Sequence, residues 1–307
     1  MTMIRRLFGF SMFVIILAFV FRNIATAEIR QTFERDDKGT EPGYTSLADD
    51  LYSPHAILIR LSDQAVLMEK NSEDRVFPAS LTKMMTAMVA IENLSNLEEV
   101  VQLTQDTFRG LYSANAALAG FQEGEAVKAI DLLYGVLLPS GAEAAVALAD
   151  HIAGSERNFV AMMNRKAADL GMNNTHFENV TGLHDDNHYS TVKDLAVLLN
   201  YALRNDTFRT MFTSSRHDIR PTNKHPEGMT LRSTMFLKLP DRHIESGEIL
   251  GGKTGYTSEA GLCLASLAVA GGEEYILVTA GAEGNQHTEP YHIKDAVTVY
   301  NRMVSAS

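Results

Sequence analysis

Short apolar runs near both ends of the chain predict two β-hairpins. Residues 56–61 and 65–70 are aliphatic runs with a short polar turn between them. Apolar runs at 262–270 and 275–280 are separated by the glycine-containing stretch 271–274. Paired runs of this kind across a turn of glycine or small polar residues are typical of hairpins. We therefore expect strands towards both ends of the folded region.

The middle of the chain shows helical patterns instead. Residues 80–91 are rich in Met and Ala without Gly or Pro, 130–138 are mostly apolar, and 142–151 are rich in Ala. An amphipathic helix is expected at 155–171 and a closing helix at 293–303. Strands at both ends with helices between them predict an α+β fold. In this fold an antiparallel sheet, built from both termini, packs beside a helical subdomain.

The first residues resemble an export signal. Arg5 and Arg6 precede an apolar run at 7–21, and the small residues at 25–27 offer a cleavage site. The run is shorter than the roughly 20 apolar residues that a spanning helix needs. Arg22 lies between the run and the cleavage site, so an uncleaved N-terminal membrane anchor is the alternative. Both interpretations export the rest of the chain.

The composition and charge of the 307 residues predict a division into three segments. After residues 1–27, the signal peptide or anchor, residues 28–52 are charged and polar and are expected to be a linker. Residues 53–307 are long enough for one large domain. The net charge of −11 argues against a nucleic-acid partner, because an acidic surface repels phosphate. Cys263 is the only cysteine, and in an apolar strand we expect a buried structural thiol.

The segment P-A-S-L-T-K-M-M-T at 78–86 is the first candidate for chemistry. If Ser80 opens a helix, Lys83 lies one turn further along the same face, where its amine can take the hydroxyl proton. The same spacing recurs at Ser190 and Lys193, but there Thr191 begins a capping pattern, so we expect that copy to cap a surface helix.

Two further motifs follow in order, S-G-A at 140–142 and K-T-G at 253–255. Together with S-x-x-K they resemble the penicillin-recognising serine enzymes, whose pattern is S-x-x-K, S-x-N and K-T-G. The flanking text, L-L-P-S-G-A-E-A-A-V-A-L-A-D, T-G-L-H-D-D-N-H-Y-S-T at 181–191 and G-G-K-T-G-Y-T-S-E-A-G, is most similar to the serine-type D-alanyl-D-alanine carboxypeptidases, the low-molecular-mass penicillin-binding proteins. The likeness covers about residues 53–305.

The resemblance implies a function for most of these residues. Ser80 would be the nucleophile, Lys83 the base and Ser140 a relay of the proton to the leaving group. Lys83 must be neutral to act, and we expect Lys253, a second cation, to lower its pKa. The backbone N–H groups of Ser80 and Tyr256 would form the oxyanion hole.

The carboxylate end of the substrate would face the K-T-G strand. By resemblance, Lys253 and Thr254 of the Lys253-Thr254-Gly255 motif and Thr257 contact the terminal carboxylate. Arg232 corresponds loosely to an arginine that the family places near it, and a solvated strand arginine is the alternative. The implied fold is that of the penicillin-binding proteins and β-lactamases, without a cofactor or metal. The implied partners are peptidoglycan stem peptides as substrates and β-lactam antibiotics as covalent inhibitors. The family's common C-terminal β domain and amphipathic helix are not expected.

One position departs from the family pattern. Ala142 stands where the family usually has Asn, whose side chain hydrogen-bonds the substrate backbone and helps to orient the lysine. Alanine can do neither, and losing one such bond costs about 0.5–1.5 kcal/mol. Ser140 follows a proline and is also expected to cap a helix while it relays the proton. For Ala142 we therefore expect an active but slower enzyme, or one that positions its substrate differently.

Other functions remain open at this level. A class A β-lactamase carries the same three motifs and needs a deacylating glutamate, for which Glu178 lies in the right region. A D,D-endopeptidase would use the same chemistry on cross-links. His184 and His188 flank two aspartates with a spacing that could bind zinc, although no H-E-x-x-H motif supports a metallopeptidase. A non-catalytic wall-binding protein is supported only by Ala142.

Overall fold

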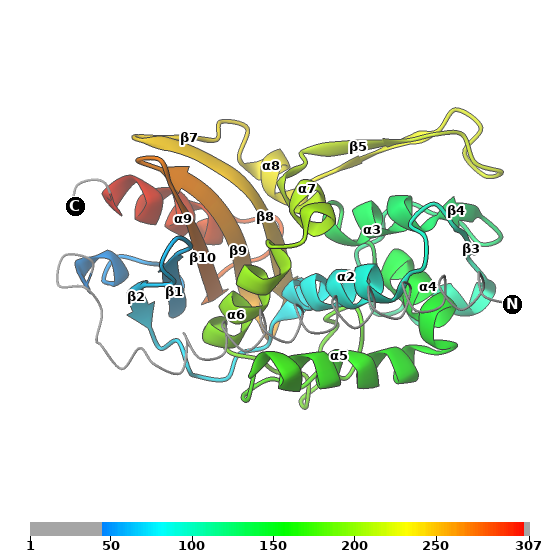
Figure 1. Ribbon diagram of the computed structural model, residues 1–307, viewed down its shortest axis with the longest axis horizontal. Helices are drawn as coiled ribbons and strands as arrows, with labels where there is room; N and C mark the ends of the chain where they lie inside the picture. The colour runs from blue at the N-terminus through cyan, green and yellow to red at the C-terminus, as the bar shows by residue number, and fades with distance from the viewer. Residues whose placement is uncertain (1–44, 304–307) are drawn as a thin grey trace, which may run out of the picture.

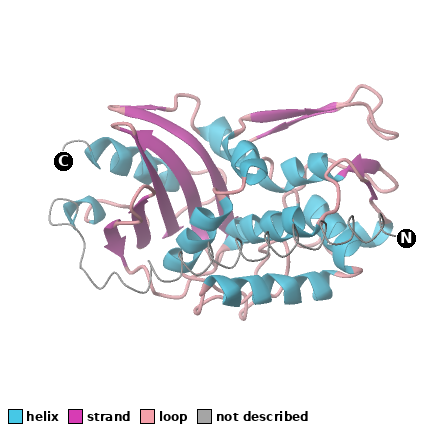
Figure 2. Ribbon diagram, in the orientation of Figure 1, coloured by secondary structure: helices cyan, strands magenta, loops and turns pink. Residues whose placement is uncertain are grey.

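The computed structural model describes residues 45–303. A sheet of antiparallel strands forms one half of this region and helices form most of the other half (Figures 1 and 2). The order of strands across the sheet is β2 (Val66–Lys70), β1 (His55–Arg60), β10 (Glu273–Ala282), β9 (Gly261–Ala270), β8 (Gly247–Thr257) and β7 (His243–Ile244). The strands nearest the N-terminus therefore pair with those nearest the C-terminus, as the sequence predicts.

Both predicted hairpins are present. β1 pairs with β2, and β9 pairs with β10 from the register Ala270↔Glu273. Gly271 and Gly272 form the turn between them, with φ angles of 58° and 86° that glycine adopts readily. β1 then closes the sheet by pairing along β10, with Ala56 opposite Thr279.

The helices lie between the two hairpins in sequence, as expected. They are α2 (Thr82–Asn93), α3 (Ala129–Leu137), α4 (Ala142–Ala153), α5 (Glu156–Leu170), α6 (Val192–Ala202), α7 (Asp206–Thr213), α8 (Thr234–Lys238) and α9 (Tyr291–Arg302). Short 3₁₀ turns are η1 (Thr45–Ala48), η2 (Ala79–Leu81) and η3 (Gln105–Phe108). Two small ribbons, β3 (Val100–Gln102) with β4 (Ala126–Lys128) and β5 (Arg216–Ile219) with β6 (Met229–Arg232), lie outside the main sheet.

The sheet is buried on both faces, which explains why its strands are apolar throughout. Ile57 and Ile59 of β1 point into a core shared with α2 to α7, where the methionines of α2 are also buried. Ala56 and Leu58 point to the opposite side, against α9 and η1. This alternation follows from the two-residue period of a strand.

The folded domain begins before the expected boundary at residue 53. Leu47 and Leu51, which we placed in the linker, are 3% and 7% exposed and pack against the sheet. The Asp295 carboxylate of α9 accepts hydrogen bonds from the backbone N–H groups of Tyr52 and Ser53, both at 2.9 Å. The expected signal segment and the first part of the linker lie outside the described residues. None of the helices in residues 45–303 is long and apolar enough to cross a bilayer.

The second S-x-x-K copy has the structural role that the sequence predicts, with one correction. The Thr191 hydroxyl accepts a hydrogen bond from the Asp194 N–H at 2.9 Å and so caps α6. The Lys193 ammonium pairs with Glu73 at 2.6 Å and not with the Ser190 hydroxyl, which bonds to Thr175 at 2.8 Å. The expectation of a surface helix is wrong, because most of α6 is buried between the sheet and α2.

Candidate active site

The candidate nucleophile lies in a tight turn at the start of α2. Ser80 is in the middle of the 3₁₀ turn η2, directly before α2 begins at Thr82. The preceding residue, Ala79, has a φ of 46°, in the left-handed region that non-glycine residues seldom occupy. Such strain is typical of functional sites that are held by their surroundings. The turn places the Lys83 ammonium 3.1 Å from the Ser80 hydroxyl oxygen.

Burial makes Lys83 a suitable proton acceptor. Its side chain is 2% exposed and donates to the Thr181 carbonyl at 2.6 Å. Burial lowers the pKa of Lys83 to about 7, and the nearby Glu143 carboxylate opposes this shift. We expected Lys253 to be the cause, but removal from water is the main one. Near neutral pH a large fraction of the amine is therefore free to accept a proton.

Ser140 and Lys253 form a second buried pair. The Lys253 ammonium donates to the Ser140 hydroxyl at 2.9 Å and to the Thr254 carbonyl at 2.8 Å. Burial, together with the charge of Lys83, holds the pKa of Lys253 well below its usual value. Ser140 has a φ of 68°. The expectation that Ser140 caps α4 is wrong: Gly141 is the N-cap residue, and the Ser140 hydroxyl faces Lys253 instead.

Two glycines let the backbone approach the nucleophile closely. A Cβ at Gly255 of β8 would lie 3.1 Å from the Ser80 nitrogen, so this strand runs directly beside the turn. A Cβ at Gly182 would lie 1.9 Å from the Ala79 carbonyl oxygen, and Gly182 has a φ of 78°. The chain segments around Ser80, Gly182 and Gly255 therefore meet with no room for side chains between them.

These elements surround one cleft of about 670 Å³. The sequence-predicted residues Ser80, Lys83, Ser140, Thr254, Gly255, Tyr256 and Thr257 all line it. Lys253 does not line the cleft. Its side chain is only 1% exposed and lies behind the cleft wall, where it contacts Ser140. Serine, amine and K-T-G strand thus meet around a single opening, although they are far apart in the sequence.

Comparison with known proteins identifies the family. The sequence pattern of the D-alanyl-D-alanine carboxypeptidases matches residues 43–284. The chain belongs to this family. It is 34% identical over 227 residues to D-alanyl-D-alanine carboxypeptidase DacF of Bacillus subtilis, which covers 74% of this chain and 57% of that protein. It is 33% identical over 245 residues to DacC of Escherichia coli, with 74% and 56% covered. The chain therefore spans little more than half the length of these curated relatives.

Solved structures have the same fold. The chain superimposes on a Streptomyces DD-transpeptidase with a TM-score of 0.75 at 28% identity, covering 83% of this chain and 98% of that one. A D-alanyl-D-alanine carboxypeptidase from Mycobacterium tuberculosis gives a TM-score of 0.74 at 26% identity, covering 87% and 95%. The expected α+β penicillin-binding-protein fold is confirmed.

Arg232 lies away from the cleft of this family member. It is on β6, is exposed, and lines a separate small hollow with Arg216 and Arg242. Among the described residues, Lys238 is the lysine or arginine that lines the cleft besides Lys83, and the imidazole rings of His184 and His292 line it as well. Sequence reasoning missed Thr234, whose hydroxyl is 2.6 Å from that of Thr254. The only sequence feature that pointed to Thr234 was its position at the end of the T-L-R-S-T stretch at 230–234.

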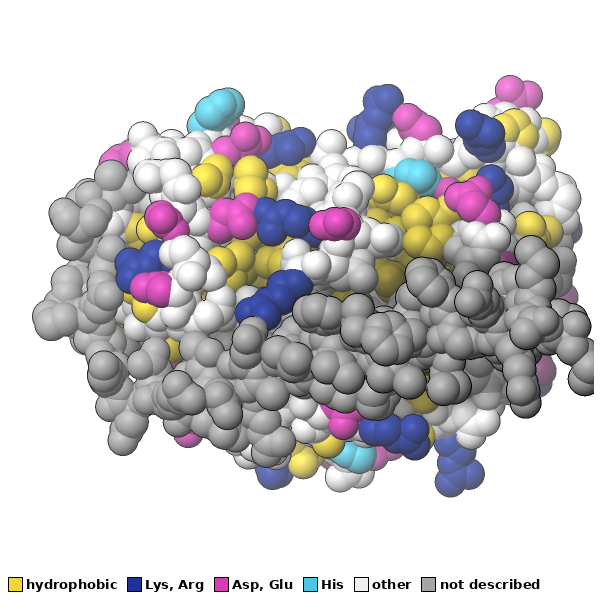
Figure 3. All heavy atoms as spheres, in the orientation of Figure 1, with side chains coloured by type: hydrophobic (Ala, Val, Ile, Leu, Met, Phe, Trp, Pro, Cys, Tyr) yellow, Lys and Arg dark blue, Asp and Glu magenta, His cyan; other side chains and the backbone are white. Residues whose placement is uncertain are grey.

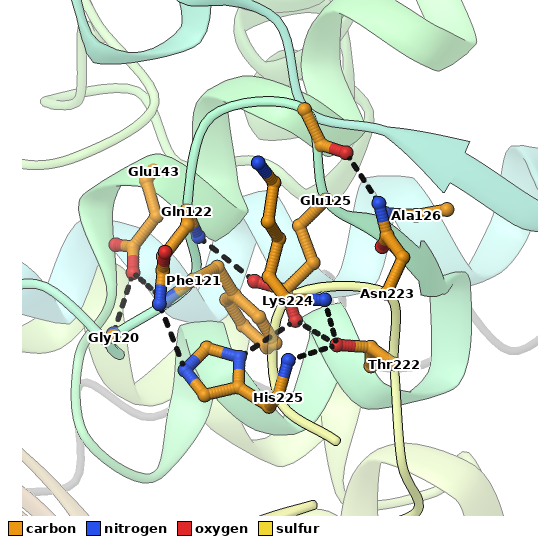
Figure 4. Close-up of polar contacts among 11 residues, drawn as sticks. Gly120, Phe121, Gln122, Glu125, Ala126, Glu143, Thr222, Asn223, Lys224 and His225 are labelled. Carbon is orange, nitrogen blue, oxygen red and sulfur yellow. Dashed lines mark hydrogen bonds and ion pairs between the residues drawn. The ribbon is translucent and has the colours of Figure 1, made fainter.

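A buried carboxylate holds another part of the cleft wall. Glu143 is fully buried, and its Oε1 accepts hydrogen bonds from the N–H groups of Ala119 and Gly120 at 2.7 and 2.9 Å. Figure 4 shows the bond from Gly120. The neighbouring Ala142 donates its N–H to the Ala117 carbonyl at 2.8 Å. Residues 114–117 line the cleft. Glu143 therefore holds the segment that follows this wall, and the Ala142 backbone, which itself lines the cleft, holds Ala117.

A second buried carboxylate joins this wall to the β5–β6 ribbon. Glu125 is fully buried and accepts hydrogen bonds from the Thr222 hydroxyl at 2.7 Å and from His225 at 2.9 Å (Figure 4). Its other oxygen accepts from the Gln122 N–H at 2.8 Å. The connection between β5 and β6 is therefore fastened to the segment that continues into the wall.

The two histidines of the T-G-L-H loop have different surroundings. His188 is buried, and its Nδ1 accepts the Glu178 N–H at 3.1 Å while its Nε2 lies 2.8 Å from the Thr82 hydroxyl. Burial lowers the pKa of His188 to about 4, so the ring is neutral and Nε2 donates. His184 lines the cleft and packs edge-on against Phe77. His188 thus supports Thr82, the residue directly before Lys83.

Cys263 is a buried thiol, as expected. It lies in β9 with no exposed surface. Burial raises its pKa to about 11, so the reactive thiolate is strongly disfavoured.

Proposed function

We propose that the protein is a serine D-alanyl-D-alanine carboxypeptidase that removes the terminal D-Ala from peptidoglycan stem pentapeptides. The observation that carries this proposal is the Ser80–Lys83 contact of 3.1 Å in a cleft that also contains Ser140 and the K-T-G strand. Family membership and the confirmed fold support the same activity.

The geometry supports an acyl-enzyme mechanism. Neutral Lys83 takes the Ser80 proton as the hydroxyl oxygen attacks the carbonyl carbon of the penultimate D-Ala. The N–H groups of Ser80 and Tyr256 stabilise the oxyanion. Ser140, hydrogen-bonded to Lys253, passes its hydroxyl proton to the leaving D-Ala nitrogen as the C–N bond breaks, and it recovers from Lys83 the proton that came from Ser80. A water molecule then attacks the ester carbonyl carbon while neutral Lys83 takes one of its protons. As the bond to the Ser80 oxygen breaks, Lys83 returns that proton and the hydroxyl is restored.

Penicillins are expected to acylate the same serine, because the strained lactam amide presents the same carbonyl to Ser80. Thr254 and Thr257 line the part of the cleft where the carboxylate of either ligand would lie. A β-lactamase would need a base aimed at the ester. Glu178 is not among the described residues that line the cleft, and its carboxylate pairs with His176 at 3.0 Å. We therefore favour slow release of penicillin over rapid turnover.

The test is to incubate the protein with diacyl-L-lysyl-D-Ala-D-Ala and measure free D-alanine, with labelled penicillin as a second probe. Wild type should release D-Ala and take up label, while Ser80→Ala should do neither. Rapid hydrolysis of penicillin without peptide cleavage would favour the β-lactamase. Release of stem peptides from cross-linked muropeptides in preference to D-Ala would favour an endopeptidase.

The substrate class implies that the domain acts outside the cytoplasm. We propose that residues 1–27 export it, either as a cleaved signal or as an anchor at the outer face of the membrane. N-terminal sequencing of the exported protein distinguishes these outcomes. A mature protein that starts at Glu28 indicates cleavage, and a membrane-bound product with an intact N-terminus indicates an anchor.

A further inference from the structure

A second hollow shares helix α8 with the cleft. It measures about 160 Å³ and is lined by the ends of β5 and β6, by α8 and by the segment that leads to β7. Thr234 and Lys238 of α8 line the cleft, whereas Phe236 and Leu237 line the hollow. Three arginines, Arg216, Arg232 and Arg242, also line the hollow.

Two of these arginines face each other in an unfavourable arrangement. Arg216 and Arg232 are direct partners across the β5–β6 ribbon, a position in which like charges destabilise a sheet. Asp218 pairs with Arg216 at 3.1 Å, but its other oxygen accepts a hydrogen bond from Thr230. Within residues 45–303 the Arg232 guanidinium has no hydrogen bond or ion pair. The pair therefore retains an uncompensated positive charge.

The third arginine adds to this surplus. The Arg242 guanidinium carbon lies 3.8 Å from the centre of the Phe236 ring, on the wall of the hollow. Its acidic neighbour Glu248 is 3.9 Å away, at the limit of an ion pair. Asp218 and Glu248 together cannot neutralise three arginines. On the face shown in Figure 3, positive and negative side chains are interspersed. A cluster with an excess of positive charge differs from this pattern, and the protein as a whole carries a net charge of −11.

The apolar side chains that line the hollow determine which class of anion fits it. Phe236, Leu237, Leu239 and Pro240 provide apolar surface, and Leu237 is 64% exposed. A phosphate group brings no hydrocarbon to cover this surface, whereas a carboxylate on an aliphatic chain does. The guanidinium fork matches both carboxylate and phosphate through two parallel hydrogen bonds, so the apolar lining makes the distinction. The hollow thus fits an alkyl carboxylate.

We propose that this hollow is a second substrate subsite that binds a carboxylate of the peptidoglycan stem peptide other than the terminal one. The inference rests on the proposed function. Arg232 lines the hollow and Thr234, two positions later in the chain, lines the cleft, so their Cα atoms lie within about 7 Å of one another. Each extended residue spans roughly 3.3–3.6 Å, so a carboxylate about three residues before the terminal D-Ala can reach the hollow.

The test compares two pentapeptides that differ in one group. The first is L-Ala-γ-D-Glu-L-Lys-D-Ala-D-Ala, whose glutamate keeps a free α-carboxylate, and in the second that carboxylate is an amide. We expect Arg232→Gln to raise KM for the acidic peptide roughly five- to tenfold, as for one exposed charge-assisted contact, with kcat unchanged. KM for the amidated peptide should not change. Arg216→Gln should act in the same direction.

The control is Arg157→Gln, which removes an exposed arginine of α5 and the same net charge. Arg232→Gln should not lower the melting temperature, because it removes a like-charge pair. Equal effects on both peptides, or no effect on either, would overturn the subsite. If wild type releases D-Ala from neither peptide and takes up no penicillin, the proposed function fails instead, so the two failures are distinguishable.

Discussion

The protonation states of single residues in the cleft are controlled by charged groups that are buried away from water. Lys83 and Lys253 are almost fully buried, and Glu143 is the buried acid that acts on Lys83. Burial also raises the pKa of Glu143, and hydrogen bonds from four backbone N–H groups, including its own, counteract this shift. The Oε2 atom of Glu143 has no hydrogen-bond partner in the described region. The protonation state of Lys83, the base, is therefore determined by its burial and by the negative charge of Glu143.

This arrangement predicts the pH dependence of acylation. The rate of penicillin acylation should rise with pH through about 7, as Lys83 loses its proton. The charge of Glu143 favours protonated Lys83, so Glu143→Gln should move this rise to lower pH. Stopped-flow acylation across pH 5–9 measures both curves. The control Glu259→Gln removes an exposed carboxylate of the cleft rim, where solvent screens the charge, and should shift the curve less. A shift to higher pH for Glu143→Gln would contradict the assignment.

Ala142 predicts a gain of activity on substitution. Its side chain lines the cleft and cannot hydrogen-bond a substrate. An amide there would add one bond, so Ala142→Asn should raise kcat/KM for the diacyl peptide by about two- to tenfold, equivalent to about 0.5–1.5 kcal/mol. Ala142→Ser, with a shorter polar side chain, is the control and should gain less. Because Ala142 is only 1% exposed, the melting temperature should be measured for both variants. Loss of turnover in a stable Ala142→Asn protein would show that the wall has adapted to alanine.

At the scale of elements, the site depends on backbone segments that touch directly. The loop that contains Gly182 presses on the turn η2, and β8 presses on it from the other side at Gly255. The Thr181 carbonyl next to Gly182 also accepts the Lys83 hydrogen bond. The position of the loop therefore determines the geometry of both nucleophile and base.

Two glycine substitutions test this contact. Gly182→Ala would place a Cβ 1.9 Å from the Ala79 carbonyl oxygen, so the loop must move. Gly154 has a similar φ of 74° with nothing within 4 Å of its Cβ, so Gly154→Ala should cost only the left-handed conformation, about 1–2 kcal/mol. Gly182→Ala should cost more in urea unfolding and should also reduce penicillin acylation. Equal costs for the two variants, with acylation retained, would mean that the contact is unimportant.

Elements were predicted well where local pattern determines them. Both hairpins, the Met-rich helix and the closing helix follow from apolar periodicity and glycine turns, and the structure contains them all. The left-handed backbone of Ala79 and Ser140 could not be predicted, because tertiary contacts impose it on residues that disfavour it. The Ser140 cap was wrong for a related reason: its hydroxyl is used by Lys253, which lies 113 positions later in the chain.

At the scale of the whole molecule, the cleft lies where the sheet meets the helical half. β8 belongs to the sheet, whereas α2 and the start of α4 belong to the helices, and all three contribute side chains. From the three motifs and their order along the chain, we predicted that they meet around one cleft. Arg232 shows the limit of that reasoning, since a loose match in sequence could not tell which side of α8 its strand would reach.

Burying lysine at this junction should affect the stability of the whole domain. The pKa of Lys83 is about 7 when folded, against about 10.4 in an unfolded chain. Between these values the unfolded chain binds the extra proton, so the free energy of unfolding should rise with pH. Lys83 contributes up to about 1.4 kcal/mol per pH unit. Urea unfolding at pH 7.5 and 9.5 should therefore show a smaller rise for Lys83→Met than for wild type. The control Lys224→Met removes an exposed lysine and should leave the rise unchanged. If Lys83→Met and wild type gain equal stability over this range, Lys83 does not carry a lowered pKa, and the base would need a different source of activation.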